Sequence, residues 1–413
     1  MHYKKTILDN GVTVLSESFS SVRSISLGIW FQVGSRDELP TEAGMSHFNE
    51  HMMFKGTPTR NALELSEAFD RLGARQNAFT SKEVTCYYAD FIDESLPGIF
   101  EILSDMVLNA TMDQEQCELE RQVVIEEIAR SEDDPEDMVY ELFTQSLWPS
   151  HTLGLPIAGT YESVGSFGSK EALAYHAKHY HAGNCFVVAS GNLDHEQLVA
   201  LAQQYLGNMK SGGDKNSELR VVPTLYESGK FVTHKDTEQA HIMLGSRSIS
   251  MVDDKRYAYQ LANFIFGGSM SSRLFQEVRE KLGLVYTVYS MLNPYVDSGF
   301  FTIYAGTRPE NYEKVVEVAK RELDKIAQGE IRKSEHELAL NAIKGSLALG
   351  LESTSQRMRM LGSSYLARGS ANSFDETVAK YAAVTLDDIH AAASELAADR
   401  AVLALVGPFD DVK

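Results

Sequence analysis

Cysteine is scarce in this sequence, and its scarcity bears on whether disulfides hold the fold and on the redox compartment of the protein. The three cysteines, Cys86, Cys117 and Cys185, are widely spaced and match neither a zinc-ribbon nor a redox spacing. A disulfide framework is therefore not expected, and a reducing compartment fits best. The sequence also lacks any run approaching the ~20 apolar residues of a membrane-spanning helix. We expect a cytoplasmic protein with no membrane partner.

Basic residues are also few, since 38 lysines and arginines face 58 aspartates and glutamates, for a formal net charge of -20. This balance argues against nucleic acid as a partner. It would attract a cationic peptide, although an acidic surface that only aids solubility is the simpler explanation. With 43% apolar residues and no low-complexity run, the chain is expected to be ordered and globular.

The first residues show strand and turn signals. Residues 2–18 alternate in polarity around Asn10-Gly11, a dipeptide typical of a tight hairpin turn. We expect this segment to be folded protein and not a signal peptide.

The length of 413 residues exceeds that of one compact core and favours two domains. The segment 209–222 has the least regular pattern, because Ser211-Gly212-Gly213 and the polar residues after it suit a flexible connection. We therefore predict a zinc-bearing domain at 1–210, a linker at 211–222 and a metal-free domain at 223–413.

The two halves carry signs of an internal repeat with an offset of 211 residues. A predicted strand ends in Gly34-Ser35-Arg36 in the first half and in Gly245-Ser246-Arg247 in the second. At the same offset, the predicted helix 46–54 matches the predicted helix 257–266. The predicted fold class is α+β, with two structurally similar repeats, each a largely antiparallel sheet flanked by helices.

The segment around residue 50 contains H-x-x-E-H, formed by His47, Glu50 and His51. On a helix, residues four apart lie on the same face, so the two imidazoles can share one metal ion with Glu50 beside them. A catalytic zinc needs three protein ligands and one open position. A chance match to so short a motif remains possible, and a third ligand decides between the two readings.

Candidates for the third ligand lie on the predicted helix 113–130. Glu120 and Glu127 are seven residues apart and point in nearly the same direction, whereas Glu126 points toward the edge of the apolar stripe. The neighbours that we expect to flank the two acids in this stripe are Val123, Val124 and Ile128. An unpaired carboxylate would be costly there, so a cation should lie opposite. That cation is a metal ion or the side chain of an arginine or lysine.

With these residues the chain resembles the inverted-motif zinc peptidases, a family that includes pitrilysin, insulin-degrading enzyme and the mitochondrial processing peptidase. The likeness covers nearly the whole chain and is greatest to the short bacterial processing-peptidase-like members. It implies a Zn²⁺ cofactor held by His47, His51 and Glu127, with Glu50 as the general base. It also assigns Glu120 to a position behind the ligands, where it orients the site.

The resemblance also points to substrate-binding residues. It implies that Asn77, Ala78, Phe79 and Thr80 form an edge strand that pairs with the backbone of a peptide substrate. Arg279 and Tyr286 match a segment whose arginine and tyrosine reach the active site of relatives. Without the resemblance, a plain hairpin strand and a surface helix beside a core tyrosine would be the simpler explanations.

The second half carries no metal site, because the 211-residue offset places alanine or leucine at the positions of the motif. Relatives of about twice this length enclose a peptide between two such pairs of domains. We therefore predict a zinc metalloendopeptidase that cleaves internal bonds of peptides or unfolded segments as a homodimer.

Two alternatives remain open. One is a non-catalytic subunit that binds peptides or partners, like those of processing peptidases or the respiratory-complex core. The other is a zinc hydrolase with a different substrate. The sequence shows no further clusters with ligand spacing that would indicate a two-metal site, and we expect His176, His179 and His181 to be surface groups.

Overall fold

The structure, a computed structural model, describes residues 3–212, 220–224, 226–398 and 401–410. The chain forms two compact units. Unit 1 comprises Met1–Ala129, Leu155–Val221 and Leu349–Ser373, and unit 2 comprises Arg130–Gly154, Val222–Ala348 and Phe374–Lys413. Compared with the expected domains, residues 130–154 group with unit 2 and residues 349–373 with unit 1. Most of the expected linker, residues 213–219, lies outside the described part of the chain.

Unit 1 contains a six-stranded sheet with the strand order β1-β2-β6-β3-β5-β4. Its strands are β1 (Lys4–Ile7), β2 (Thr13–Ser18), β3 (Ser24–Phe31), β4 (Arg75–Thr80), β5 (Thr85–Ile92) and β6 (Cys185–Gly191). Its helices are α1 (Met45–Met52), α2 (Ala62–Arg71), α3 (Leu96–Asn109), most of α4 (Gln114–Asp133), α6 (Tyr161–Gly165), α7 (Ser169–His179), α8 (His195–Leu206) and α12 (Thr354–Arg368).

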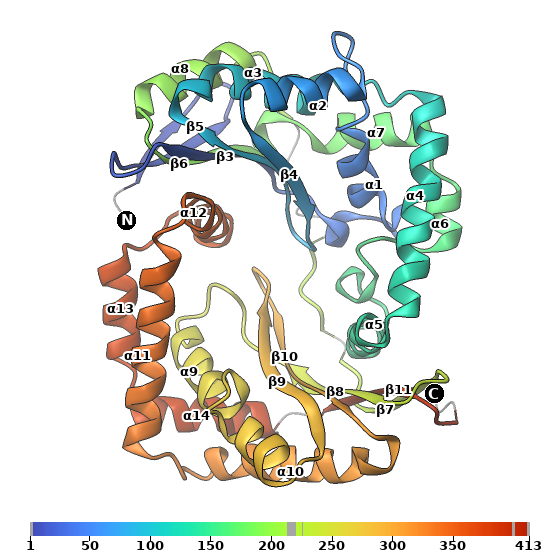
Figure 1. The fold of residues 1–413 in the computed structure, drawn as a ribbon, viewed down its shortest axis with the longest axis vertical. Coiled ribbons are helices and arrows are strands. Elements are labelled where there is room, and N and C mark those ends of the chain that lie inside the picture. Colours follow the sequence, from blue (N-terminus) through green and yellow to red (C-terminus); the bar gives the residue numbers. More distant parts are fainter. Residues whose placement is uncertain (1–2, 213–219, 225, 399–400, 411–413) are drawn as a thin grey trace. The chain divides into compact units, whose positions relative to one another are not determined.

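The sheet of unit 1 has a helical layer on each face. Helices α3 and α8 pack on one face and α12 on the other, as Figure 1 shows. The pattern of small residues explains how closely α12 approaches. A Cβ atom at Gly28 would lie 2.6 Å from Trp30 Nε1, and one at Gly362 would lie 2.6 Å from the same indole. The Trp30 ring therefore fills the space that two glycines leave between sheet and helix.

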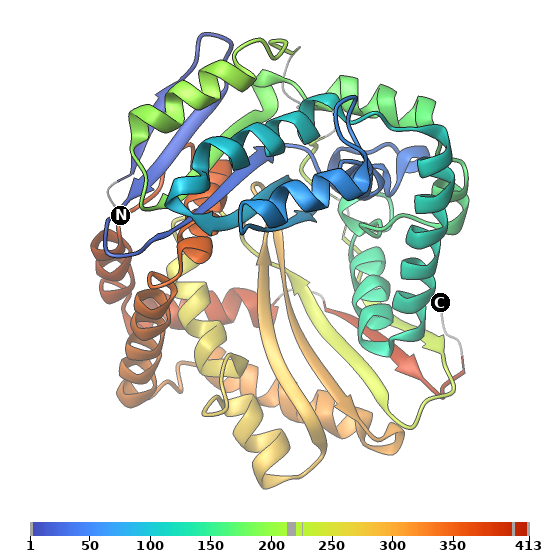
Figure 2. The ribbon, with the colours of Figure 1, turned by 45° about the horizontal axis from the view of Figure 1, so that its top comes forward.

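Unit 2 contains a five-stranded sheet with the order β7-β11-β8-β10-β9. Its strands are β7 (Gly229–His234), β8 (Ala240–Arg247), β9 (Val285–Pro294), β10 (Gly299–Thr307) and β11 (Val402–Gly407). Its helices are α5 (Pro135–Leu147), α9 (Arg256–Gly267), α10 (Tyr312–Ala327), most of α11 (Lys333–Gly350), α13 (Phe374–Ala382) and α14 (Leu386–Ala398). The long antiparallel pair β9 and β10 is drawn in orange in Figure 2.

The two sheets confirm the predicted α+β repeats. The order β2-β6-β3-β5-β4 in unit 1 matches β7-β11-β8-β10-β9 in unit 2. In each of these five-strand orders the first pair is parallel and the remaining pairs are antiparallel. Helix α1 packs beside the edge strand β4, and α9 packs beside the edge strand β9.

The tripeptide that first suggested the repeat is not structurally equivalent in the two units, so that part of the alignment was wrong. Gly245-Ser246-Arg247 is the end of β8 and pairs with β10. Gly34-Ser35-Arg36 lies beyond the end of β3 and leads toward α1. The connection between strand and helix is longer in unit 1, which gives that unit a buried segment before α1.

Each unit takes one covering helix from the other half of the sequence. Helix α5 contributes Val139, Phe143 and Leu147 to an apolar cluster with β10 and β11 of unit 2. Helix α12 contributes Met358 and Leu361 to the corresponding cluster of unit 1. This exchange explains why a single boundary near residue 211 does not describe the compact units.

Candidate metal centre

Helix α1 holds the H-x-x-E-H motif. Phe48 and Met52 bury its apolar side in the core of unit 1, which leaves His47 and His51 together on another side. The helix begins after Gly44, whose φ of +93° favours glycine. A Cβ atom at Gly44 would also lie 2.5 Å from Ala158 O, so the start of α1 is packed closely against a neighbouring chain segment.

Helix α4 carries the expected third ligand. The buried residues on this helix are Cys117, Glu120, Val124 and Ile128, which lie along one stripe. The Glu127 side chain is 45% exposed, and Val123 is exposed as well. The expectation that Glu127 lies within the apolar stripe was therefore wrong. It lies at the solvent-facing side of the stripe, where water could reach a metal held by this residue.

The structure brings His47, His51 and Glu127 together. His47 Nε2 and His51 Nε2 are 3.2 Å apart, and Glu127 Oε2 lies 3.7 Å from the first and 3.6 Å from the second. Tetrahedral zinc with bonds of ~2.0–2.2 Å places its ligand atoms ~3.4 Å from one another. Two imidazoles and one carboxylate at these separations fit a zinc ion and leave its fourth position open.

Glu120 lies directly behind His51. Its Oε1 is 2.8 Å from His51 Nδ1, and Lys55 forms an ion pair with its other oxygen. An Nδ1–H that donates to Glu120 leaves the Nε2 lone pair free for a metal. Burial alone would raise the pKa of Glu120, but the hydrogen bonds from His51 and Lys55 lower it below its ordinary value. Glu120 therefore remains a carboxylate that fixes the orientation of the ligand.

The pKa values of the two histidines are shifted in opposite directions. Burial, followed by repulsion from His51, lowers the pKa of His47 to about 4, so this imidazole is neutral at pH 7. Burial also lowers the pKa of His51, but its hydrogen bond to Glu120 and the charge of Glu127 outweigh burial and raise it. The carboxylates of Glu120, Glu127 and Glu50 thus favour positive charge at this position, which is the electrostatic environment that a metal cation needs.

Glu50 is held in place by the edge strand. The Thr80 hydroxyl on β4 donates a short hydrogen bond to Glu50 Oε2. Burial raises the pKa of Glu50 above its ordinary value, and the hydrogen bond from Thr80 opposes that rise only in part. A carboxylate with a raised pKa, one oxygen held and the other free, can accept a proton.

The predicted substrate strand is an edge strand of the sheet. β4 contains Asn77, Ala78, Phe79 and Thr80, and among the described residues it pairs only with β5. The Ala78 N–H donates to Asn77 Oδ1 at 2.8 Å. Phe79 packs edge-on against Trp30, with ring centroids 5.4 Å apart. The role of this strand in peptide binding stays a prediction.

Arg279 and Tyr286 lie together in unit 2. Arg279 belongs to a π-helical segment, Phe275–Lys281, and its guanidinium carbon lies 5.6 Å from the Tyr286 ring centroid. Tyr286 is on β9 and is 78% exposed, so it is not the core tyrosine of the simpler explanation. The exposed Tyr286 side chain beside Arg279 is accessible to a ligand.

One expectation about histidines was wrong. His179 and His181 are buried instead of exposed. The His179 ring packs against Tyr175 with centroids 4.2 Å apart, and Asn184 donates to the His179 carbonyl. His179 ends α7 and His181 follows it, where the chain turns inward to β6, and this long-range packing has no local sequence signal.

Comparison with known proteins identifies the family. The family described as Insulinase (Peptidase family M16) matches residues 13–161, and the Peptidase M16 inactive domain matches residues 166–343. An uncharacterized zinc protease of Streptomyces coelicolor is 39% identical over 99% of this chain and 90% of its own length. The chain belongs to peptidase family M16. An uncharacterized zinc protease of Bacillus subtilis is 37% identical, covering 98% of each chain.

Solved structures show the same M16 fold. A protease from Helicobacter pylori superimposes with a TM-score of 0.90 at 22% identity, covering 98% of this chain and 99% of the other. A peptidase M16 inactive domain from Pseudomonas fluorescens gives 0.92 at 20% identity, covering 100% and 99%. At these identities the likeness establishes the fold. Within the described residues, no helix has the length and apolar character of a membrane span.

Proposed function

We propose that this M16 chain is a zinc metalloendopeptidase. The observation that carries the proposal is the convergence of His47 Nε2, His51 Nε2 and Glu127 Oε2 within 4.8 Å of one another. Beside them lies Glu50, a partly buried carboxylate with a raised pKa. This set contains the three ligands and the proton acceptor that hydrolysis of a peptide bond by an activated water requires.

Each side chain of the site has its own role in this reaction. When bound, zinc lowers the pKa of a water and polarises the substrate carbonyl. Glu50 accepts the proton of the attacking water on the oxygen that Thr80 does not hold, and then delivers it to the leaving amine. Glu120 keeps His51 in the required orientation through Nδ1. No serine or cysteine nucleophile is needed, because water attacks directly.

We further propose that β4 binds an extended segment of the peptide through its outer edge. The outward groups of β4 offer backbone hydrogen bonds with little demand on sequence, which suits peptides or unfolded segments as substrates. Arg279 and Tyr286 would contact the substrate from unit 2 of a second copy of the chain, so the active form is a homodimer. The free, buried cysteines support a cytoplasmic location.

Metal content together with peptide cleavage tests the proposed function. The purified chain should contain about one zinc per molecule, lose cleavage of an unstructured peptide on chelation, and regain it when zinc is restored. Mass spectrometry of the products should show cuts at internal bonds. A chain that purifies without zinc, or that binds zinc and leaves every peptide intact, would instead be the non-catalytic subunit.

A further inference from the structure

A buried charged segment precedes the metal helix in unit 1. Gly34–Glu38, here called the strap, connects the end of β3 toward α1, and Arg36, Asp37 and Glu38 are fully buried. Three consecutive buried ionisable residues are unusual, because each loses its hydration and needs polar partners in compensation; burial raises the pKa of Glu38 to about 8. The partners of the strap therefore indicate what it holds in place.

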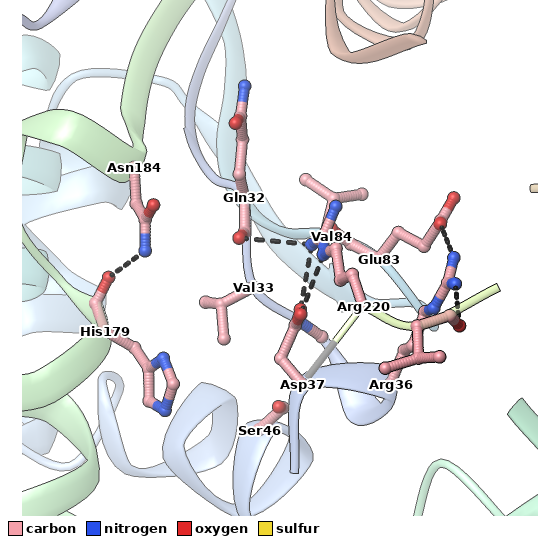
Figure 3. Close-up of polar contacts among 12 residues, drawn as sticks. Gln32, Val33, Arg36, Asp37, Ser46, Glu83, Val84, His179, Asn184 and Arg220 are labelled. Atoms are coloured by element: carbon pink, nitrogen blue, oxygen red, sulfur yellow. Dashed lines mark hydrogen bonds and ion pairs between the residues drawn. The ribbon is translucent and has the colours of Figure 1, made fainter. Parts of the chain in front are cut away.

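Asp37 is paired with an arginine from a distant part of the chain. Arg220 Nε lies 2.7 Å from Asp37 Oδ1, and Arg220 Nη2 lies 2.8 Å from Asp37 Oδ2. The same Nη2 also donates to the carbonyls of Gln32 at 3.2 Å and Glu83 at 2.9 Å (Figure 3). One guanidinium thus joins the strap to the end of β3 and to the turn before β5.

A second arginine, Arg36, lies on the strap and contacts the segment that contains Arg220. Arg36 on the strap donates through Nη1 to Glu83 Oε1 at 2.6 Å and through Nη2 to the Val221 carbonyl at 3.0 Å. Arg220 and Val221 are the last residues of unit 1 before the chain enters unit 2. The strap and this exit segment are therefore joined by two arginines, the buried Arg36 and the largely buried Arg220, shown in Figure 3.

The other end of the strap holds the start of the metal helix. Glu38 accepts from the Gly44 N–H through Oε2 and from the Ser46 N–H through Oε1, both at 2.7 Å. The residue after Ser46 is His47. Glu38 thus fixes the first turn of α1, and Asp37 beside it is fixed by Arg220.

We propose that Arg220 is a positioning residue for the zinc site, acting through Asp37, Glu38 and the start of α1 on His47. Without its guanidinium, Asp37 would keep the hydrogen bond from the Gly34 N–H, at 2.9 Å from Oδ2, but would lose its charged partner in a buried site. The strap must then move to hydrate this carboxylate, and Glu38 moves with it. Mutation of a group that orients a metal ligand typically costs ~10- to 100-fold in metal affinity, and we expect the loss of Arg220 to act on His47 in the same way. This inference rests on the proposed zinc site.

Arg357 supplies a matched control. It pairs with Glu17 at 2.8 Å, with side-chain exposures of 21% and 6%, against 20% and 0% for Arg220 and Asp37. Like Arg220, Arg357 forms an ion pair with a residue from the N-terminal part of unit 1 that is distant in sequence. This pair joins α12 to β2 and not the strap to the exit segment. Replacing either arginine by methionine should lower the melting temperature. Only the replacement of Arg220 should also lower the zinc affinity.

The test compares zinc affinity in the wild type, Arg220→Met, Arg357→Met and the double variant Asp37→Asn/Arg220→Met. All should be measured well below their melting temperatures, where circular dichroism shows them folded. Arg220→Met should raise the zinc dissociation constant ~10- to 100-fold and change the visible spectrum of the Co²⁺-substituted protein. Arg357→Met should change neither. The double variant should recover much of the affinity, because no buried carboxylate is left unpaired.

Each outcome has a distinct meaning. Wild-type zinc affinity and an unchanged Co²⁺ spectrum in folded Arg220→Met would overturn the positioning role, and so would equal losses in Arg220→Met and Arg357→Met. If Arg220→Met does not fold, the double variant and Arg220→Lys replace it. Arg220→Lys keeps a positive charge opposite Asp37 but cannot donate to the carbonyls of both Gln32 and Glu83. Its zinc affinity should therefore lie between those of the wild type and Arg220→Met, and wild-type affinity would contradict the positioning role of Arg220. A wild-type chain that binds no zinc would refute the proposed function instead.

Discussion

Glu120 Oε1 lies 2.8 Å from His51 Nδ1, on the side of the imidazole opposite to the metal-facing Nε2. Replacing Glu120 by glutamine keeps the shape but removes the charge that fixes the ring and pairs with Lys55. The zinc dissociation constant should rise ~10- to 100-fold, as measured by competition with a chelator. Glu115→Gln, on an exposed position of the same helix, should have no effect. Equal affinities for Glu120→Gln and Glu115→Gln would remove Glu120 from the site.

The adjacent acids of α4 offer a sharper comparison. Both Glu126 and Glu127 are exposed, but only Glu127 lies within 4 Å of both imidazoles. Glu127→Gln should lose most of its zinc because an amide is a poor replacement for an anionic ligand. Glu126→Gln should keep about one zinc per chain. The reverse pattern in metal analysis of the two purified proteins would show that the ligand was misassigned.

Much of the candidate metal site could be predicted from the sequence, because its residues recur at helical spacings, although the half-exposed Glu127 does not lie in the buried stripe as expected. His47 and His51 are one turn apart, and Glu120 and Glu127 are two turns apart. The contacts of Thr80 with Glu50 and of Lys55 with Glu120 join residues from separate elements, which periodicity cannot detect.

The fold was predictable to a similar degree. Alternating and helical patterns indicated two α+β repeats, and the two sheets confirm them. The exchange of α5 and α12 was not predictable, because it depends on which sheet an apolar helix covers. The buried strap and its partner Arg220 lie more than 180 residues apart, and charged residues are ordinarily read as surface groups.

Unit 2 contains a partly buried carboxylate, Glu335, with a defined pH response. Burial opposes ionisation of Glu335, but hydrogen bonds from Arg273 and Arg332 outweigh it and hold its pKa at about 2. A carboxyl whose pKa is lower in the folded state adds stability above its ordinary pKa and loses it as pH falls toward 2. Glu335→Gln should therefore be less stable than the wild type at pH 7, and the difference should shrink below about pH 4.5. Thermal melts across this range check it.

The exposed Glu337 provides the control for that experiment, since its side chain is 60% exposed beside Lys333. Glu337→Gln should follow the wild-type melting curve at every pH. A constant gap between the wild type and Glu335→Gln from pH 7 to pH 3 would contradict the lowered pKa.

The proposed homodimer can be tested by mixing two inactive variants. One chain carries Glu50→Gln, and the other carries Arg279→Ala with Tyr286→Phe. In a mixed dimer one site unites intact Glu50 with the intact arginine and tyrosine of the partner, so activity should return to about half of wild type per dimer. Differently tagged chains that co-purify would prove exchange of subunits. Exchange without recovered activity would mean that Arg279 and Tyr286 do not serve the zinc site of the partner chain.

Cleavage by Glu50→Gln is the most direct measurement of the proposed function. Glutamine preserves the shape of the side chain and the hydrogen bond from Thr80 is retained, but the amide cannot accept the proton of the attacking water. The variant should bind zinc like the wild type and cleave an unstructured peptide at least ~100-fold more slowly. Zinc-loaded Glu50→Gln that cleaves the peptide at near the wild-type rate would contradict hydrolysis with Glu50 as the general base.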